Sequence, residues 1–203
     1  MQITVERLIV GELAVNCYIV GNTETNECFI VDPGAEAQQV IRRVGDRKAC
    51  AVLLTHGHYD HIGAVDEICA HYGIPAYIHA QDAAKLSDPM GNVSAVFGQP
   101  VVQHTVPQTI EQEGCLTLAG IPLEILHTPG HSNGCICAIL PQGQGILTGD
   151  TVFAHGYGRT DFADGDFSKL VQSLRRLYRL TPKMIVYPGH DVPGTVGRDP
   201  MGD

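Results

Sequence analysis

The chain has 203 residues, of which 44% are hydrophobic and 17% are charged, and its formal net charge is −9. This length suits one well-buried domain or two small ones, and the composition is that of a globular protein rather than a disordered or fibrous one. The negative charge and the lack of a basic stripe argue against nucleic-acid binding, and no apolar run reaches the roughly 20 residues that span a bilayer.

The chain begins with MQITVERLIVGELAVNCYIVG, which lacks the basic, apolar and small-residue segments of a signal peptide. We therefore expect a cytoplasmic protein whose first element is a strand. The seven cysteines have irregular spacing and do not predict a disulfide framework. Cys135 and Cys137 stand two positions apart in GCICAIL, which favours one face of a strand over a metal-binding pair.

Next we predict a hairpin, formed by the apolar runs NCYIVG and CFIVDPG around the polar turn NTETNE. Helical spacing follows in AEAQQVIRRVG, which ends at Gly45, and a buried strand is predicted for ACAVLLT. A second helix is predicted for IGAVDEICAHYG, which ends at Gly73. We then expect a strand at PAYIHA, a helix at QDAAKLS, and a loop from about Asp88 to Pro107.

The second half begins with four predicted strands, at CLTLAG, IPLEILHTPG, CICAILP and GILTGD. A helix is predicted at FSKLVQSLRRLYRL and a last strand at KMIVYPGH. Strands outnumber helices, but helices occur throughout the chain. The pattern therefore predicts a layered α/β sandwich rather than a pure β-sandwich.

Side chains of metal-binding types follow several of these predicted strands. The stretch THGHYDH comes directly after one strand, and TPGH, TGD and YPGH follow later ones. Loops at strand ends are where α/β proteins build sites, and imidazole and carboxylate donors suit Zn²⁺, Fe²⁺ or Mn²⁺. Such a set exceeds one tetrahedral zinc and suits two ions that share a carboxylate and a water. The candidate ligands are His56, His58, Asp60, His61, His131, Asp150 and His190.

In their order along the chain, THGHYDHIGA, TPGHSNG, LTGD and YPGH resemble the motifs of the metallo-β-lactamase superfamily, over nearly the whole sequence. Within that superfamily, NCYIVG, IVDPG and GYGRTDF resemble the glyoxalase II (hydroxyacylglutathione hydrolase) branch and its short relatives. The resemblance implies an αββα sandwich of two mixed β-sheets flanked by helices, with the metal site at one sheet edge. We expect residues 1–203 to form one such domain, without the C-terminal helical domain that binds glutathione in full-length glyoxalase II.

The resemblance also implies how the ligands are divided. His56, His58 and His131 would hold one metal, and Asp60, His61 and His190 would hold the second. Asp150 would bridge the two ions. We expect two divalent ions, with Zn²⁺ first and Fe²⁺ or Mn²⁺ as alternatives.

The implied function is that of a metal-dependent hydrolase, which uses a metal-bound hydroxide to cleave a small thioester or ester. Two ions roughly 3.5–4 Å apart lower the pKa of a shared water towards about 7, so no serine or cysteine nucleophile is needed. Asp60 is also a candidate catalytic group that orients this water. We expect a small-molecule substrate and neither a nucleic-acid nor a membrane partner, while the sequence leaves the oligomeric state open.

Two other enzymatic classes are considered. Persulfide dioxygenases of the same superfamily share segments like TPGHSNGC and GRTDF, which implies an alternative site of one Fe²⁺ held by His56, His131 and Asp150. A serine hydrolase is disfavoured, because Ser132 lacks the G-x-S-x-G turn and its neighbouring histidine is a candidate ligand.

The segment FAHGYGRTDF follows the Asp150 motif closely and is a candidate for the mouth of the site. His155, Tyr157 and Arg159 are the candidate substrate-binding residues. The planar guanidinium of Arg159 suits a substrate carboxylate, and the alternative is internal pairing with Asp161 or Asp164.

Asp32, in VDPG, is either a hydrogen-bond partner of a histidine ligand or a turn-forming residue. Four further histidines lie in helix or strand patterns and are interpreted as structural or surface residues. They are His71, His79, His104 and His127.

Overall fold

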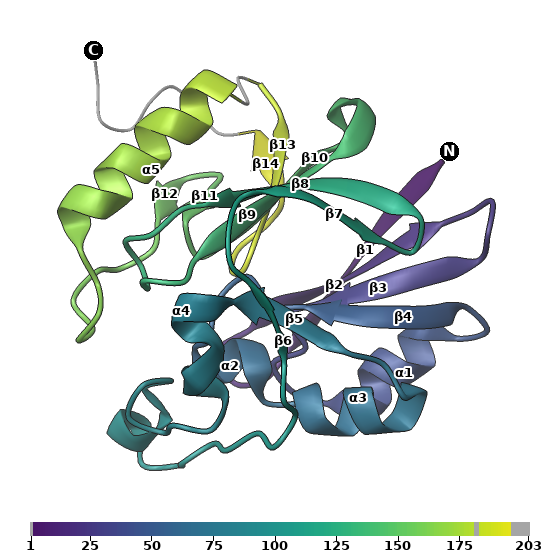
Figure 1. The fold of residues 1–203 in the computed structure, drawn as a ribbon, viewed down its shortest axis with the longest axis horizontal. Coiled ribbons are helices and arrows are strands. Elements are labelled where there is room, and N and C mark those ends of the chain that lie inside the picture. Colours follow the sequence, from purple (N-terminus) through teal and green to yellow (C-terminus); the bar gives the residue numbers. More distant parts are fainter. Residues whose placement is uncertain (1, 181–182, 196–203) are drawn as a thin grey trace.

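The computed structural model describes residues 2–180 and 183–195. Two six-stranded β-sheets lie against each other, with helices on their outer faces (Figure 1). The first sheet has the strand order β1-β2-β3-β4-β5-β6, and the second has the order β14-β13-β10-β9-β8-β7. Both sheets contain parallel and antiparallel pairs, so the predicted αββα sandwich of two mixed sheets is confirmed.

The first half of the described chain contributes the first sheet and its helices. Its strands are β1 (Ile3–Val10), β2 (Val15–Asn22), β3 (Glu27–Val31), β4 (Lys48–Leu53), β5 (Ala76–His79) and β6 (Gln108–Ile110). Its helices are α1 (Ala37–Val44), α2 (Tyr59–Ile62), α3 (Val65–Tyr72), α4 (Ala80–Ala83) and the short 3₁₀ helices η1 (Ala84–Leu86) and η2 (Ser94–Phe97).

The second half contributes the second sheet, one long helix and a small hairpin. The strands of the sheet are β7 (Gly114–Leu118), β8 (Ile121–His127), β9 (Ile136–Leu140), β10 (Gly145–Gly149), β13 (Ile185–Pro188) and β14 (Gly194–Thr195). The other elements are the 3₁₀ helix η3 (Pro141–Gly143), the hairpin strands β11 (Val152–Phe153) and β12 (Gly156–Tyr157), and helix α5 (Phe167–Leu180).

Strand β2 is buried on both faces, which explains the continuous apolar run CYIV at its centre. Its side chains alternate between two hydrophobic clusters. Cys17 and Ile19 belong to the cluster beneath α1 and α3, whereas Tyr18 and Val20 belong to the cluster between the sheets. Helix α5 covers the outer face of the second sheet, where Leu174 is fully buried. The apolar periodicity of each element therefore specifies which layer it joins.

The parallel strand pairs bring distant parts of the sequence to one edge. Strand β3 pairs in parallel with β4, and β10 pairs in parallel with β13. Parallel neighbours end on the same side of a sheet. Asp32 and His56 thus follow adjacent strands of the first sheet, and Asp150 and His190 follow adjacent strands of the second.

The largest difference from the predicted elements lies after the first histidine cluster. A single helix was expected over residues 62–73, but the chain forms α2 and α3 with a break between them. At the break, Ala64 donates its N–H to the carbonyl of Pro33 at 2.9 Å rather than to the turn before it. Strand β6, the hairpin β11–β12 and strand β14 were not predicted, since each has only two or three residues. Among the described residues, no helix is long and apolar enough to cross a bilayer.

Candidate metal centre

The structure brings all seven candidate ligands together at the shared edge of the two sheets. They form two sets of converging side chains, which we call the first donor group (His56, His58 and His131) and the second donor group (Asp60, His61 and His190). Within each group, one potential ligand atom from every residue lies within 4.8 Å of the others. Each group combines residues that follow strands of both sheets.

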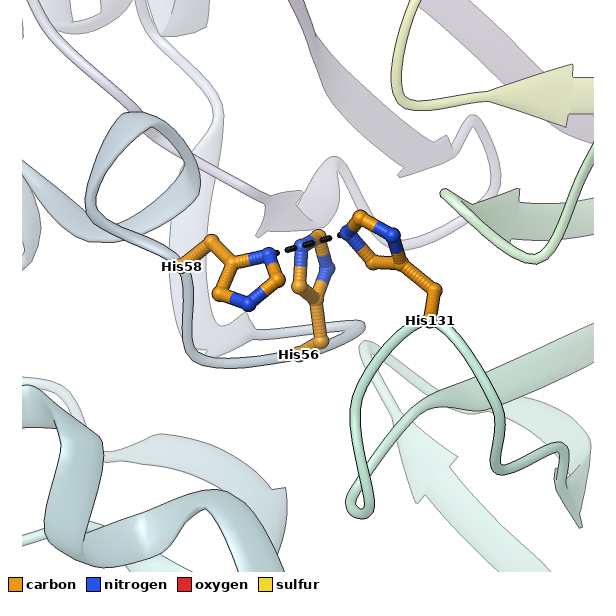
Figure 2. A group of neighbouring side chains, drawn as sticks. All are labelled: His56, His58 and His131. Carbon is orange, nitrogen blue, oxygen red and sulfur yellow. Dashed lines mark hydrogen bonds between the residues drawn. The ribbon is translucent and has the colours of Figure 1, made fainter. Parts of the chain in front are cut away.

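The first donor group is almost completely buried, and its three imidazoles face one another (Figure 2). His58 Nδ1 lies 2.9 Å from His131 Nε2. The ring of His56 packs edge-on against both, with centroids 4.7 Å and 4.9 Å away. Two ring nitrogens at this separation require either a proton or a cation between them.

Asp150 lies between the two groups. One of its oxygens, Oδ2, is 3.5 Å from His131 Nε2 of the first group and 3.5 Å from His190 Nε2 of the second. Its other oxygen, Oδ1, is 3.6 Å from His61 Nε2. The second group closes through Asp60 Oδ2, which is 3.3 Å from His190 Nε2 and 3.7 Å from His61 Nε2. Asp150 therefore faces donors of both groups.

Hydrogen bonds fix the orientation and tautomer of the buried His61 and His56 rings. His61 donates its Nδ1–H to Asp32 Oδ2 at 3.0 Å, because a carboxylate can only accept. Asp32 Oδ2 also accepts the hydroxyl of Thr55 at 2.7 Å, so that hydroxyl has an oxygen lone pair left for the Nδ1–H of His56 at 3.1 Å. In the neutral form of each ring the lone pair is therefore on Nε2, which is turned towards the site.

Backbone carbonyls orient two candidate ligands that follow strands of the second sheet. His131 donates its Nδ1–H to the carbonyl of Arg159 at 2.7 Å, and His190 donates its Nδ1–H to the carbonyl of Leu13 at 3.1 Å. A carbonyl cannot donate, so in each neutral ring the free lone pair is on Nε2. Four of the candidate imidazoles therefore present Nε2 to the centre.

A third convergent set, Asp32 with His56 and His61, also has ligand-type atoms close together. We assign Asp32 a supporting role instead, because its carboxylate already accepts bonds from Thr55 N–H, Thr55 O–H and His61. Between the two interpretations that the sequence left open, this geometry is that of a hydrogen-bond partner of a histidine ligand. The backbone of Asp32 is nonetheless left-handed, with a φ of 47°.

The polar atoms that remain unsatisfied fit metal ions. Among the described side chains, His56 Nε2, His58 Nε2, His61 Nε2 and Asp150 Oδ1 are buried without a hydrogen-bond partner. Buried polar atoms are rarely left unpaired, and such a set indicates a missing ion or water. Gly189 supports this fit, because a Cβ there would lie 2.2 Å from Asp150 Oδ1 and would displace the carboxylate. The donor set of imidazoles and carboxylates suits Zn²⁺ and Fe²⁺.

Protonation differs between the two groups. Burial, together with the neighbouring imidazoles, lowers the pKa of His56 and of His58, which keeps both rings neutral. Burial also disfavours a charge on His61, but the carboxylates of Asp60, Asp150 and Asp32 outweigh it and raise the pKa of His61 to about 10. Without a metal ion, His61 of the second donor group is therefore protonated, and its positive charge balances the surrounding carboxylates.

A cleft of about 330 Å³ opens above the two groups. Its floor includes candidate ligand side chains from both groups and Asp150, and its walls are mostly apolar and aromatic. Tyr59 and Phe97 pack together on one side, with ring centroids 5.4 Å apart. The wall residues are Leu13, Tyr59, Val93, Phe97, Phe153, Gly158, Arg159 and Phe162.

The three candidate substrate-binding residues lie in different places. Arg159 lines the cleft, but its guanidinium makes two 2.6 Å bonds to Asp161 and stacks over the ring of Phe162. Tyr157 lies outside the lining and packs near Phe167. His155 is an exposed residue of the turn between β11 and β12 and is also outside the lining.

Sequence reasoning did not identify Asp82, which lies behind the first donor group and is fully buried. It also missed the cleft wall at Leu13, whereas Phe153 and Phe162 belong to the segment expected at the mouth of the site but were not singled out. Asp82 belongs to a segment, QDAAKLS, that reads as an ordinary short helix. The sequence signal that could have pointed to a buried acceptor here was the two glycines near the candidate ligands, Gly57 and Gly134. Their backbone N–H groups donate to Asp82.

Comparisons with known proteins agree with this geometry. Residues 10–190 match the family described as the Metallo-beta-lactamase superfamily. The chain is 35% identical over 200 residues to the hydroxyacylglutathione hydrolase GloC of Haemophilus influenzae, a similarity that covers 96% of this chain and 94% of the relative.

Two solved structures resemble the fold over nearly its full extent. The B3 metallo-beta-lactamase BLEG-1 superposes with a TM-score of 0.91 at 30% identity, covering 98% of this chain and 99% of the other. TTHA1623, solved in a di-iron-bound form, superposes with a TM-score of 0.85 at 31% identity, covering 97% of this chain and 100% of the other.

Proposed function

The chain belongs to the metallo-β-lactamase superfamily, in its glyoxalase II-like branch, and from that premise we propose that it cleaves a small thioester or ester as a metal-dependent hydrolase. The observation that carries this proposal is the pair of donor groups that face Asp150 at the floor of an open cleft. The similarity to a hydroxyacylglutathione hydrolase supports a thioester as the substrate.

The protein would hold two divalent cations. His56, His58 and His131 would bind one, Asp60, His61 and His190 the other, and Asp150 would contact both. We propose Zn²⁺ as the metal, with Fe²⁺ or Mn²⁺ as alternatives, and the di-iron form of TTHA1623 supports keeping iron among them. When bound, such a pair supplies an acidified water as nucleophile and positive charge for the carbonyl oxygen.

The chain's own groups would orient the reaction. Asp60 lines the cleft and is only partly buried, so its carboxylate is placed to accept a hydrogen bond from the attacking water. Burial opposes the ionisation of Asp60, but the neighbouring imidazoles of His61 and His190 outweigh it and lower its pKa. Asp60 is therefore an acceptor at neutral pH. A thiolate leaving group needs little protonation, and no separate general acid is required.

The substrate would enter along the walls of the cleft. Phe97 and the other aromatic walls suit an apolar part of the substrate. Arg159 would bind a substrate carboxylate, for which its guanidinium must leave Asp161. Tyr157 and His155 would contact only a substrate portion that extends beyond the cleft.

The remaining proposals concern the protein as a whole. We propose that residues 1–203 act as one unit, and that the partner is a small molecule rather than nucleic acid or membrane. A cytoplasmic location is supported by the cysteines, since all seven are free thiols.

The test pairs metal content with activity. Protein purified without added metal is assayed for zinc, iron and manganese, and then for cleavage of S-lactoylglutathione and of a simple acyl thioester. We expect about two metal equivalents, with thioester cleavage and no oxygen uptake. His58→Ala, which removes one ligand of the first donor group, should abolish cleavage while the circular dichroism spectrum stays unchanged.

The contrary result is equally specific. One iron per chain, with oxygen uptake that depends on glutathione persulfide, would replace the hydrolase by the mononuclear dioxygenase that uses His56, His131 and Asp150. A His58→Ala variant that retains full thioesterase rate would contradict the two-metal site. The protein is also assayed for hydrolysis of nitrocefin, because the structural neighbour BLEG-1 is a B3 metallo-beta-lactamase.

A further inference from the structure

Asp82 is a fully buried carboxylate that contacts both loops of the first donor group. Its Oδ2 accepts the N–H of Gly57 at 2.8 Å and the hydroxyl of Ser132 at 2.7 Å. Its Oδ1 accepts the N–H of Gly134 at 2.8 Å. Gly57 stands between two ligands, His56 and His58, and Ser132 directly follows the third, His131.

These bonds join segments from different sheets. The loop with His56 and His58 follows β4 of the first sheet, and the loop with His131 follows β8 of the second. At the base of the two loops, Ile136 N–H donates to the carbonyl of Thr55 at 2.9 Å. Asp82 provides a second connection between the two loops, from α4.

The packing around Asp82 leaves little freedom. A Cβ on Gly134 would lie 2.6 Å from the Cβ of Asp82, so the loop can approach the carboxylate only with glycine at this position. The charge of Asp82 is matched by Lys85, whose Nζ lies 3.2 Å from Oδ1 and 2.7 Å from Asp164 Oδ2. Asp164 in turn accepts the N–H of Asn133, in the His131 loop, at 3.0 Å.

We propose that Asp82 is a positioning residue for the first metal: it holds His56, His58 and His131 in their converged arrangement before an ion arrives. Its described hydrogen bonds reach both loops of the first donor group and none of Asp60, His61 or His190. Losing the carboxylate should therefore weaken one metal position and spare the other. This inference rests on the proposed two-metal site.

Zn²⁺ affinity, measured on the full chain by competition with a chelator, tests the proposal. Asp82→Asn keeps the size of the side chain but replaces one acceptor oxygen with a donor and removes the charge. We expect the affinity of one position to fall roughly 10- to 100-fold, as for other groups that orient metal ligands, and that of the other to change less than about twofold. Ser132→Ala removes one of the three bonds and should act in the same direction, but less.

Double variants identify the affected position. In a His58→Ala background the first position is already lost, so adding Asp82→Asn should change zinc binding little. In a His190→Ala background only the first position remains intact, so adding Asp82→Asn should remove most of the remaining zinc. The opposite pattern would place the effect of Asp82 on the second metal and would overturn the proposal.

Asp66→Asn is the matched control for a purely structural role. The Asp66 carboxylate also secures a loop, accepting the N–H groups of His104 and Thr105 and the Thr105 hydroxyl, but away from both donor groups. It should lower thermal stability without changing either zinc affinity. Equal zinc losses in Asp66→Asn and Asp82→Asn would overturn the positioning role.

Other outcomes are also decisive. Wild-type affinities in Asp82→Asn would overturn the inference alone and leave the hydrolase proposal standing, since activity is not the readout. A wild-type chain that binds no zinc, iron or manganese would overturn both the Asp82 inference and the hydrolase proposal. If Asp82→Asn does not fold, Ser132→Ala carries the test, and an unchanged first position there contradicts the proposal.

Discussion

Arg159 can bind a substrate carboxylate only if its guanidinium gives up its ion pair with Asp161. Its guanidinium makes two bonds to Asp161, and both side chains are more than half exposed. An exposed ion pair contributes little to stability. The Arg159 guanidinium can therefore leave the Asp161 carboxylate and bind a substrate carboxylate at little energetic cost. Because Arg159 lines the cleft and already binds a carboxylate, variants of this pair can test whether the enzyme prefers an anionic substrate.

Substitutions of Arg159 and of Asp161 should have opposite effects on the KM of an anionic substrate. Arg159→Ala should raise KM for a carboxylate-bearing thioester roughly tenfold, the usual size of a lost charged hydrogen bond. Asp161→Ala should lower KM for the same substrate, because it releases the guanidinium. Steady-state kinetics with a neutral thioester of equal length provide the control, and neither variant should change its KM. Unchanged KM values for the anionic substrate in both variants would exclude Arg159 from carboxylate binding.

Asp32 supports the second donor group through His61, as Asp82 supports the first through its loops. Asp32→Asn would remove an acceptor of the His61 Nδ1–H and release the tautomer that places the lone pair on Nε2. We expect Zn²⁺ affinity at the second position to fall by at least about tenfold, measured by chelator competition. The first position should change less, since Asp32 reaches His56 only through Thr55. A loss confined to the first position would be inconsistent with this assignment.

At this scale the sequence pointed to the side chains that converge at the candidate centre, but not to their hydrogen-bond partners. Imidazole and carboxylate groups after strand ends are visible in THGHYDH, TPGH and YPGH. The partners of their second ring nitrogens include the carbonyls of Leu13 and Arg159, and a backbone carbonyl leaves no trace in a residue type. Asp82 was missed for a related reason, because its role arises only when two loops from different sheets meet at α4.

Helix α5 shows the clearest relation between an element and its sequence. The apolar spacing of FSKLVQSLRRLYRL predicted a helix over residues 167–180, and the structure has α5 over the same residues. Its buried positions pack on the outer face of the second sheet, whereas Gln172 is exposed. Long amphipathic elements of this kind are specified locally, which is why their limits could be predicted.

A core substitution in α5 should therefore be costly. Leu174 is fully buried in the cluster beneath the helix, and Leu174→Ala should lower the free energy of unfolding by about 2–5 kcal/mol. Urea denaturation followed by circular dichroism measures the change. Gln172→Ala on the same helix is the control and should stay within about 0.5 kcal/mol of wild type. Similar midpoints for the two variants would contradict the packing of α5 on the sheet.

Elements whose limits depend on distant segments could not be predicted. The break between α2 and α3 accompanies the approach of the Pro33 carbonyl, which comes from the turn after β3. Local apolar spacing ran through this break and indicated one helix. Strand β6 likewise exists only because it pairs with β5, over the three positions from Tyr77 to His79. Tertiary contacts, rather than periodicity, set these boundaries.

For the whole molecule, the candidate metal centre joins the two halves of the sandwich. Each donor group takes residues from loops after both sheets: His58 faces His131 in the first, and Asp60 faces His190 in the second. Asp150 adds a further contact across the same edge. A bound ion would therefore act as a cross-link between sheets that otherwise meet through an apolar core.

Removing the metals should lower stability without unfolding the protein. Ions that bind only the folded chain stabilise it by about 2.7 kcal/mol each at a free concentration of 100 times Kd, so chelation should lower Tm and added Zn²⁺ should restore it. The apo protein should stay folded, because the cluster between the sheets includes large buried side chains such as Tyr18, Phe29 and Leu123 and needs no ion. Differential scanning calorimetry with and without chelator measures the shift, and a His58→Ala/His190→Ala variant should respond much less. Complete unfolding on chelation at room temperature would instead show that the ions, rather than the apolar layer, hold the two sheets together.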